Sequence, residues 1–306
     1  MVVPLAGRVD NTGQIKCDGD IYMGVIEEYS ALIDAVESQR ERLQGPQQPD
    51  LWGGKVAKRF RADPKRQMDD NFNTLAEFVR PEDVFVDAGG GAGRFSLPMS
   101  LRCREVINVD PSGGMGDEFA ESASEAGITN ASFILSDWLD VEGVQGDVAH
   151  AAHVTYFVRD IERFIVKLVG AARRRVIINM ASIAGPMLNA RLFKMVYGED
   201  QAMVPAHTKL LPVLWAMGIL PDVRVLPHGT HFGGVPHIQD FPQSKEDAVE
   251  VALAGVWLAP QHRDQAEVVV REKFDELFIE DSDGFIPQWL PEVQQVLVTW
   301  ETEQAG

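Results

Sequence analysis

A short stretch of the sequence combines residue types that bind nucleotide-like ligands. Residues 84–95 read VFVDAGGGAGRF, an apolar run followed by an acid and a glycine cluster. The acid and the alternate glycines are Asp87, Gly89, Gly91 and Gly93. Glycine in such a cluster costs backbone entropy, so it is expected where the chain turns sharply or lets another molecule approach its backbone. A buried strand that runs into such a turn and then into a helix offers free N–H groups to a ligand.

Two classes of ligand compete for this glycine turn. Dinucleotide-binding proteins use G-x-G-x-x-G/A, in which the last small residue lets the helix pack on the strand. Here the frame that starts at Gly89 places Arg94 at the last position, and the frame that starts at Gly91 places Ser96 there. An acid at the start of the turn also does not suit a loop that holds only phosphates. The turn therefore favours a ligand with positive charge over a pyrophosphate.

The acid-x-G-x-G-x-G pattern resembles motif I of the class I S-adenosylmethionine-dependent methyltransferases, in the branch called type 11. The resemblance continues in order along the chain, over about residues 75–182. INVDPS at 107–112 and ILSDWLD at 134–140 resemble the second- and third-strand motifs of that family. Residues 147–165 resemble the fourth-strand region of members that act on small molecules. The resemblance implies S-adenosylmethionine as the cofactor.

The resemblance also implies a role for the acid at each strand end. Asp110, with Pro111 beside it, would bind the ribose hydroxyls. Asp137 would meet the adenine amino group, and Trp138 would cover the adenine face. Asp110 lies 23 residues after Asp87, which is one strand–helix–strand step, so its carboxylate falls at the neighbouring strand end. Each acid taken singly also fits a simple helix cap, but three acids at consecutive strand ends are harder to explain by capping.

The end of the fourth predicted strand holds the candidate catalytic residues, His153 and Tyr156. Methyl transfer from a sulfonium is an in-line displacement, in which the protein aligns the acceptor, excludes water and often removes a proton. His153 is a candidate base because the pKa of histidine lies near neutrality, and it is also a candidate for contact with the cofactor. A backbone-bonded histidine and a core tyrosine are the structural alternatives. His150 is predicted to point to the opposite face of the strand.

A second group of histidines, His228, His231 and His237, lies near Asp240. Metal ligands must converge, yet the spacing of the first two histidines makes them diverge on a strand. No recognised zinc spacing is present either. We therefore predict no metal site, and a contribution of this segment to the acceptor pocket is the better interpretation.

A parallel sheet would bring these residues together. After Pro81, short apolar runs alternate with helical patterns, which is typical of strands joined by crossover helices. We predict strands at 84–88, 105–110, 131–137, 147–154, 175–181, 222–232 and 293–301. Together with the resemblance, this predicts an α/β, Rossmann-like, seven-stranded sheet. The sheet would be mostly parallel, with an antiparallel last strand and helices on both faces.

The chain divides into a cap and a core in this interpretation. Residues 1–80 are predicted to form an N-terminal helical cap, and residues 81–306 to form a class I methyltransferase domain. Helical insertions are expected at about 183–220 and 240–290, where the apolar pattern predicts helices at 186–198, 208–220, 244–259 and 264–279.

Part of the cap is a candidate lid. Trp52, Arg59, Phe60 and Arg61 lie in the segment WGGKVAKRFRADP, just before the predicted core. In proteins of this resemblance, the segment before the core often folds over the cofactor. An ordinary helix that docks on the sheet is the structural alternative.

Composition bounds the partners and the compartment. The 28 Lys and Arg against 46 Asp and Glu give a formal net charge of −18, which repels phosphate backbones. The basic run at 173–175 is interpreted as a solvated helix end.

Cys17 and Cys103 are too few for a disulfide framework. The longest apolar stretch, 210–221, is too short to span a bilayer, and the N-terminus lacks the pattern of a signal peptide. We therefore expect a cytoplasmic protein that binds neither nucleic acid nor membrane, with 251–259 as a possible homodimer face if exposed.

The sequence thus predicts methyl transfer from S-adenosylmethionine to a small-molecule acceptor. Oxygen, nitrogen and carbon acceptors all remain open. Two other functions also remain open: an NAD(P)-dependent oxidoreductase, and a non-catalytic protein that binds S-adenosylmethionine.

Overall fold

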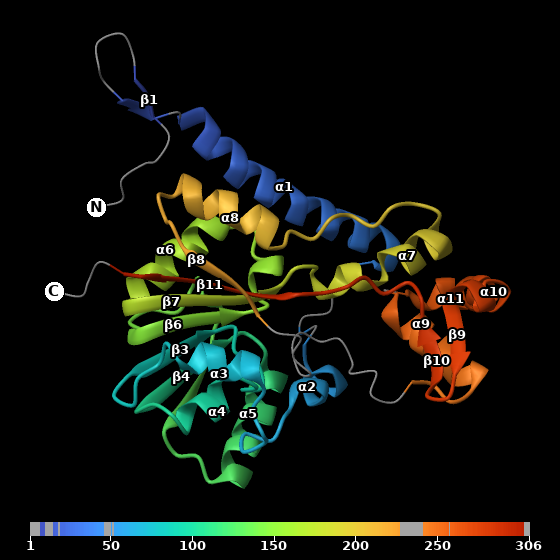
Figure 1. The fold of residues 1–306 in the computed structure, drawn as a ribbon, viewed down its shortest axis with the longest axis horizontal. Coiled ribbons are helices and arrows are strands. Elements are labelled where there is room, and N and C mark those ends of the chain that lie inside the picture. The colour runs from blue at the N-terminus through green and yellow to red at the C-terminus, as the bar shows by residue number, and fades with distance from the viewer. Residues whose placement is uncertain are drawn as a thin grey trace.

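The computed structural model describes residues 7–9, 15–17, 19–45, 50, 52–226, 241–256 and 258–302. In these residues, seven strands form one sheet in the order β5-β4-β3-β6-β7-β11-β8 (Figure 1). Neighbours from β5 to β7 are parallel, and β11 is antiparallel to both β7 and β8. The predicted sheet is therefore confirmed. Its strands are β3 (Val84–Ala88), β4 (Glu105–Asp110), β5 (Ala131–Leu135), β6 (Gly146–Ala152), β7 (Ala172–Ala181), β8 (Asp222–Leu226) and β11 (Gln295–Glu301).

Helices cover both faces of the sheet, as predicted (Figure 1). One face is packed by α1 (Gly19–Gln44), α6 (Ile161–Ala171) and α8 (His207–Ala216). The other face is packed by α3 (Asp70–Ala76), α4 (Ser96–Ser100) and α5 (Gly113–Ala126). Because both faces are covered, the central strands are continuous apolar runs rather than alternating ones. All five residues of β3 are buried, including Asp87.

The N-terminal segment is not wholly helical. A short antiparallel pair, β1 (Gly7–Val9) and β2 (Ile15–Cys17), precedes α1. Helix α1 lies along α8 and α6, and the Tyr29 hydroxyl donates a hydrogen bond to the carbonyl oxygen of Thr155 at 2.7 Å. Helix α2 (Lys55–Phe60) instead packs near α5, on the side where the glycine turn lies.

Helix α7 (Ala190–Tyr197) of the first insertion and the second insertion form one small unit beside the sheet, whereas α8 of the first insertion covers the sheet itself (Figure 1). This unit has a hydrophobic cluster of its own, built from α7, α9 (Lys245–Gly255), α10 (Arg263–Glu272) and α11 (Phe274–Leu277). The single helix predicted over 264–279 is two helices, α10 and the short α11, and α11 is followed by a hairpin of β9 (Phe278–Asp281) and β10 (Gly284–Pro287). Most apolar residues of α9 are buried in this cluster and are not available to a partner. The homodimer face expected at 251–259 stays a prediction.

No helix in the described part of the chain is long and apolar enough to cross a bilayer.

Candidate functional site

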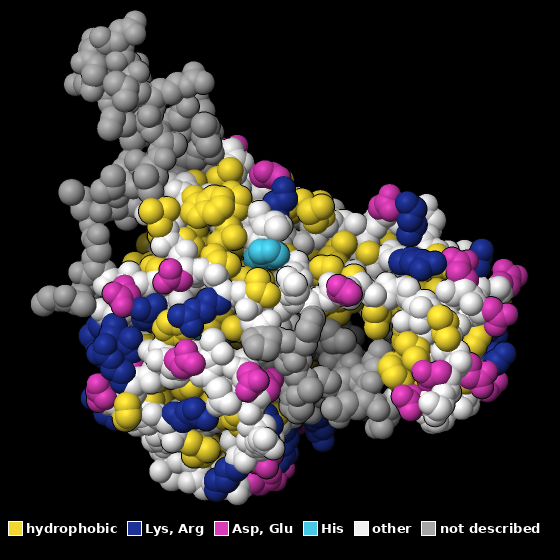
Figure 2. Space-filling view, in the orientation of Figure 1, with side chains coloured by type: hydrophobic (Ala, Val, Ile, Leu, Met, Phe, Trp, Pro, Cys, Tyr) yellow, Lys and Arg dark blue, Asp and Glu magenta, His cyan; other side chains and the backbone are white. Residues whose placement is uncertain are grey.

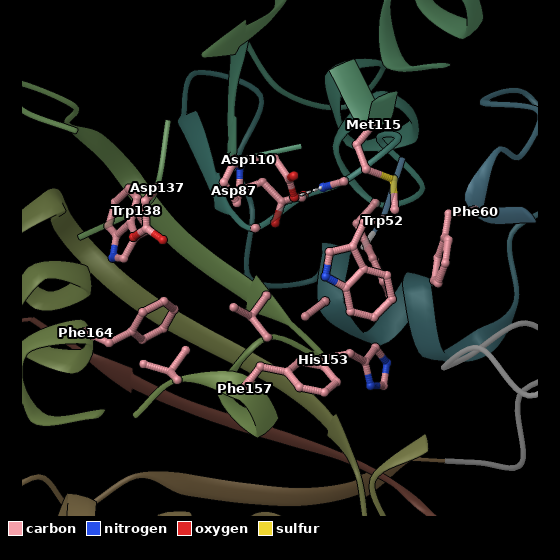
Figure 3. A pocket seen from close by; sticks show the side chains of 18 of the residues that line it. Trp52, Phe60, Asp87, Asp110, Met115, Asp137, Trp138, His153, Phe157 and Phe164 are labelled. Atoms are coloured by element: carbon pink, nitrogen blue, oxygen red, sulfur yellow. Dashed lines mark hydrogen bonds between the residues drawn. The ribbon is translucent and has the colours of Figure 1, made fainter. Parts of the chain in front are cut away.

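A cavity of about 430 Å³ lies at the carboxyl ends of the parallel strands. This volume is within the range of pockets that bind small ligands. Figure 3 shows its two ends, with Asp137 and Trp138 at one and Phe60 and His153 at the other. Asp110 lies between them. The cavity is thus where parallel α/β sheets bind their ligands, beyond the ends of the strands at the point where the strand order reverses.

The glycine turn requires its glycines. Gly89, Gly91 and Gly93 have φ angles of +74°, +54° and +83°, which side chains other than glycine rarely adopt. Gly90 has an ordinary φ, but a Cβ there would lie 2.6 Å from an oxygen of Asp87. The N–H of Gly89 donates a hydrogen bond to the carbonyl oxygen of Val109 at 2.7 Å, which holds the start of the turn. The turn is therefore packed closely on β3 and β4, and its backbone faces the cavity.

Asp110 joins the glycine turn to the start of α5. Its Oδ2 accepts a hydrogen bond from the N–H of Gly91 at 2.9 Å, and its Oδ1 accepts from the N–H of Ser112 at 2.9 Å. Burial raises the pKa of this carboxyl, while the two N–H groups oppose the rise. A carboxylate oxygen has two acceptor sites, so each oxygen can accept one further bond. Asp110 and Pro111 both line the cavity, as the predicted ribose contact requires.

Asp137 and Trp138 line the other end of the cavity. The Asp137 side chain is exposed, and its Oδ1 accepts a hydrogen bond from the N–H of Leu139 at 2.7 Å. Trp138 is buried. Asp110 and Asp137 each accept a hydrogen bond from the main-chain N–H two residues ahead, which is the local bonding that a capping role would involve. Both side chains nevertheless face the cavity.

Asp87 is held from below by a buried network. Its Oδ1 accepts from Nδ1 of His150 at 2.8 Å, and its Oδ2 accepts from the hydroxyl of Ser96. The other ring nitrogen of His150 lies 3.1 Å from Oδ1 of Asn179. His150 is completely buried, and the ring of Phe95 packs against it with centroids 5.4 Å apart. Asp87 also lines the cavity, and each of its oxygens already accepts one hydrogen bond.

His153 lies in the cavity, directly after β6. Among the described residues it is the only one other than glycine with a positive φ, at 60°. Its N–H donates to the carbonyl oxygen of Asn179 at 2.8 Å. Burial, with a smaller effect of the nearby Arg94 charge, lowers the pKa of the imidazole to about 3. The ring is therefore neutral at neutral pH and is a weak base.

Tyr156 does not face the cavity. It is 3% exposed, and its hydroxyl donates to the carbonyl oxygen of Ala181 at 3.2 Å and accepts from the N–H of the same residue. Burial raises the pKa of the phenol. The side chain ties the turn Thr155–Phe157 to the end of β7, so the expectation that Tyr156 contacts the acceptor is not met. Phe157, its neighbour, lines the cavity instead, which the sequence analysis missed.

The segment before the core covers part of the cavity. Trp52 and Phe60 line it, and their rings meet edge-on with centroids 5.8 Å apart. Trp52 also packs edge-on against Phe157 at 5.7 Å. The hydroxyl of Ser112 donates to Asp50 at 3.0 Å, which fixes the segment at the start of α5. The lid interpretation therefore has geometric support for Trp52 and Phe60.

The two arginines of that segment lie outside the cavity. Arg61 forms ion pairs on α5 with Glu121 at 2.7 Å and with Glu125. Arg59 is exposed on α2. These residues secure or border the segment but do not line the cavity.

The histidine group at His228, His231 and His237, with Asp240, lies outside the described residues. Within the described ranges, no three His, Cys, Asp or Glu side chains gather as metal ligands would.

The core of the chain matches a known protein family in sequence. Residues 86–177 match the model of a family described as a methyltransferase domain. An uncharacterised protein of Haemophilus influenzae is 28% identical over 150 residues. That match covers 48% of this chain and 55% of the relative, so the chain spans about half the length of this curated relative.

Two solved structures share the fold over most of the chain. A candidate methyltransferase of Bacillus halodurans superposes with a TM-score of 0.51 at 8% identity, over 76% of this chain and 97% of that one. A [4+2]-cyclase superposes with a TM-score of 0.50 at 14% identity, over 93% of this chain and 97% of that one. At identities this low, the similarity shows only that the folds are alike.

Proposed function

Because this chain carries a class I S-adenosylmethionine-dependent methyltransferase domain of the type 11 branch, we propose that the whole protein transfers a methyl group from S-adenosylmethionine to a small-molecule acceptor. One observation carries the proposal. The glycine turn after β3 and the acids that end β4 and follow β5, Asp110 and Asp137, line the same cavity. Simple capping of separate turns does not require them to converge.

The residues present fit this cofactor. Asp110 keeps acceptor capacity for ribose hydroxyls, and the exposed Asp137 keeps an oxygen for an exocyclic amine. Trp138 supplies an aromatic wall at the same end as Asp137. When bound, S-adenosylmethionine supplies an already activated methyl group on its sulfonium. The chain must therefore supply alignment and a dry site rather than activation of the donor.

The aromatic mouth would exclude water from the acceptor end. Trp52, Phe60 and Phe157 pack edge-on around it. His153 lies at the same end, and its neutral imidazole can orient an acceptor by a hydrogen bond. A pKa of about 3 makes it a poor base near neutral pH, so we propose that it positions the acceptor and does not take its proton.

The distribution of charge supports a small acceptor over a nucleic acid. The basic run at 173–175 lies in β7 rather than at a helix end, and its arginines pair with acids. Arg173 pairs with Asp147 at 2.9 Å and Arg175 with Glu301 at 2.6 Å. On the one side of the molecule that Figure 2 draws, acidic and basic side chains are interspersed, without a broad basic stripe. A binding site for a phosphate backbone would need such a stripe.

Transfer of a labelled methyl group tests the proposal. The protein is incubated with methyl-labelled S-adenosylmethionine and, separately, with cellular RNA and with a protein-free small-molecule extract. We expect label in the small-molecule fraction, and Asp110→Ala as the matched control should reduce it strongly. Label in RNA alone would overturn the choice of acceptor. Cofactor binding without transfer to either fraction would identify a non-catalytic binding protein.

A further inference from the structure

A positive charge that no described residue pairs with in an ion pair lies at the acceptor end of the cavity. Arg94 follows the glycine turn, lines the cavity and is half-buried. Its guanidinium lies over the rings of Phe60 and Phe95, with distances of 5.8 and 5.7 Å to the ring centroids. Within the described part of the chain, no carboxylate forms an ion pair with this guanidinium and no acceptor takes a hydrogen bond from it.

The charge persists under ordinary conditions. Burial lowers the pKa of Arg94 to about 10, which still leaves the side chain protonated at neutral pH. Asp87, the cavity acid whose charge acts on Arg94, forms no ion pair with it, and its two oxygens accept hydrogen bonds from His150 and Ser96. Arg66 adds a second positive charge beside Arg94, because its guanidinium donates to the Arg94 carbonyl oxygen at 3.0 Å. Two like charges thus lie close together, and the described acids that act on them, Asp87 on Arg94 and Asp63 and Asp69 on Arg66, do so without an ion pair.

Arg94 differs from the arginines that pair with acids at the surface, as Arg159 does with Asp34 at 2.6 Å and Arg263 with Glu250 at 2.6 Å. A half-buried cation without an ion-pair partner is unfavourable, because burial removes part of its hydration and the two aromatic rings replace only part of it. The guanidinium fork matches a carboxylate through two parallel N–H bonds. An anionic ligand in the cavity would remove the imbalance.

We propose that Arg94 recognises a carboxylate on a molecule bound in this cavity. The inference rests on the proposed function and narrows its substrate class. Two carboxylates qualify: that of an acceptor, and the α-carboxylate of the cofactor itself. The position favours an acceptor, since Arg94 lies close enough to His153 to lower its pKa and packs on Phe60 at the aromatic mouth. The acceptor is then an aromatic or apolar molecule that carries a carboxylate.

Binding measurements on three proteins test the proposal: the wild type, Arg94→Gln, and Arg271→Gln as a matched control. Arg271 is an exposed arginine on α10, paired with Glu267 and remote from the cavity. The acceptor arm uses protein saturated with S-adenosylhomocysteine. It compares benzoate, cinnamate and indole-3-acetate with their amides. The wild type and the control should prefer at least one carboxylate to its amide by about tenfold or more, and Arg94→Gln should lose that preference.

The cofactor arm compares S-adenosylhomocysteine with 5′-methylthioadenosine, which lacks the carboxylate. If the acceptor supplies the carboxylate, Arg94→Gln leaves both affinities unchanged. If the cofactor supplies it, the variant weakens S-adenosylhomocysteine alone. A thermal melt confirms folding, and Arg94→Lys should keep part of the preference because the charge remains without the fork.

The outcomes separate the inference from the function on which it rests. If neither adenosyl compound binds the wild type, the proposed function fails whatever Arg94 does. If both bind, and residue 94 affects neither the carboxylate preference nor the ratio of the two adenosyl affinities, the Arg94 inference alone is overturned.

Discussion

Replacement of Asp110 by alanine tests the ribose contact at the centre of the site. The carboxylate has two tasks in the structure, because it bonds the N–H groups of Gly91 and Ser112 and also faces the cavity. A hydrogen bond to a charged group contributes about 1.5–3 kcal/mol. Loss of a ribose bond should therefore weaken the binding of adenosyl ligands by about 10- to 150-fold. Loss of the two N–H bonds should also lower the free energy of unfolding.

A comparison of two nucleosides separates these effects. Adenosine and 2′,3′-dideoxyadenosine share the base, so a displaced glycine turn weakens both, whereas a lost ribose bond affects adenosine alone. Calorimetry should show that the wild type prefers adenosine by about tenfold or more and that Asp110→Ala binds both equally. Asp140→Ala, which removes an exposed acid nearby that does not line the cavity, should behave as the wild type. A preference for adenosine that survives in Asp110→Ala would refute the ribose assignment.

Three further predictions concern the turn, the histidine and the lid. Gly93→Ala should lower the free energy of unfolding by about 1–3 kcal/mol in urea titrations, because its φ is +83° and a Cβ would lie 2.7 Å from neighbouring side chains. Gly113→Ala, at a position with open space around it, should leave the free energy of unfolding nearly unchanged. Equal losses of stability in the two variants would contradict the packing argument. The folded protein should keep His153 neutral down to about pH 3, while the unfolded chain takes up the proton below about pH 6.5. The contribution of the neutral His153 to the stability of the fold is then present above about pH 6.5 and lost as the pH falls toward 3. An NMR titration of the folded protein in which the His153 ring takes up its proton with a midpoint near pH 6.5 would disprove this prediction. Trp52→Ala should weaken S-adenosylhomocysteine binding several-fold in calorimetry with little change in melting temperature, because the side chain is 39% exposed; unchanged affinity would remove its role as a lid.

The parts of the fold that were predictable are those in which one pattern governs a whole element. Strands β3 and β4 were predicted with their observed bounds, because each is a mostly apolar run with an acid at or next to its end. The hairpin of β9 and β10 was missed, because the helical spacing of apolar residues continues from α10 through Phe278. Asp283 and Gly284, between the two strands, carry a turn signal that could have indicated the hairpin.

The site was predictable where a single strand end fixes a residue. Asp110 and Asp137 follow from the rule that ligands lie at the carboxyl ends of parallel strands. The network beneath Asp87 was not predictable, because His150 becomes its neighbour only through the pairing of β3 with β6, strands that are not consecutive. Tyr156 was assigned to the acceptor, but the tight turn after β6 buries its ring. Spacing along a strand says nothing about such a turn.

A crystal structure with S-adenosylhomocysteine tests the central claim most directly. The account predicts the adenosyl group in the 430 Å³ cavity, with ribose hydroxyls within hydrogen-bond distance of Asp110 and the base at the end that holds Asp137 and Trp138. A cavity that remains empty at saturating ligand, or an adenosyl group bound elsewhere on the protein, would contradict it.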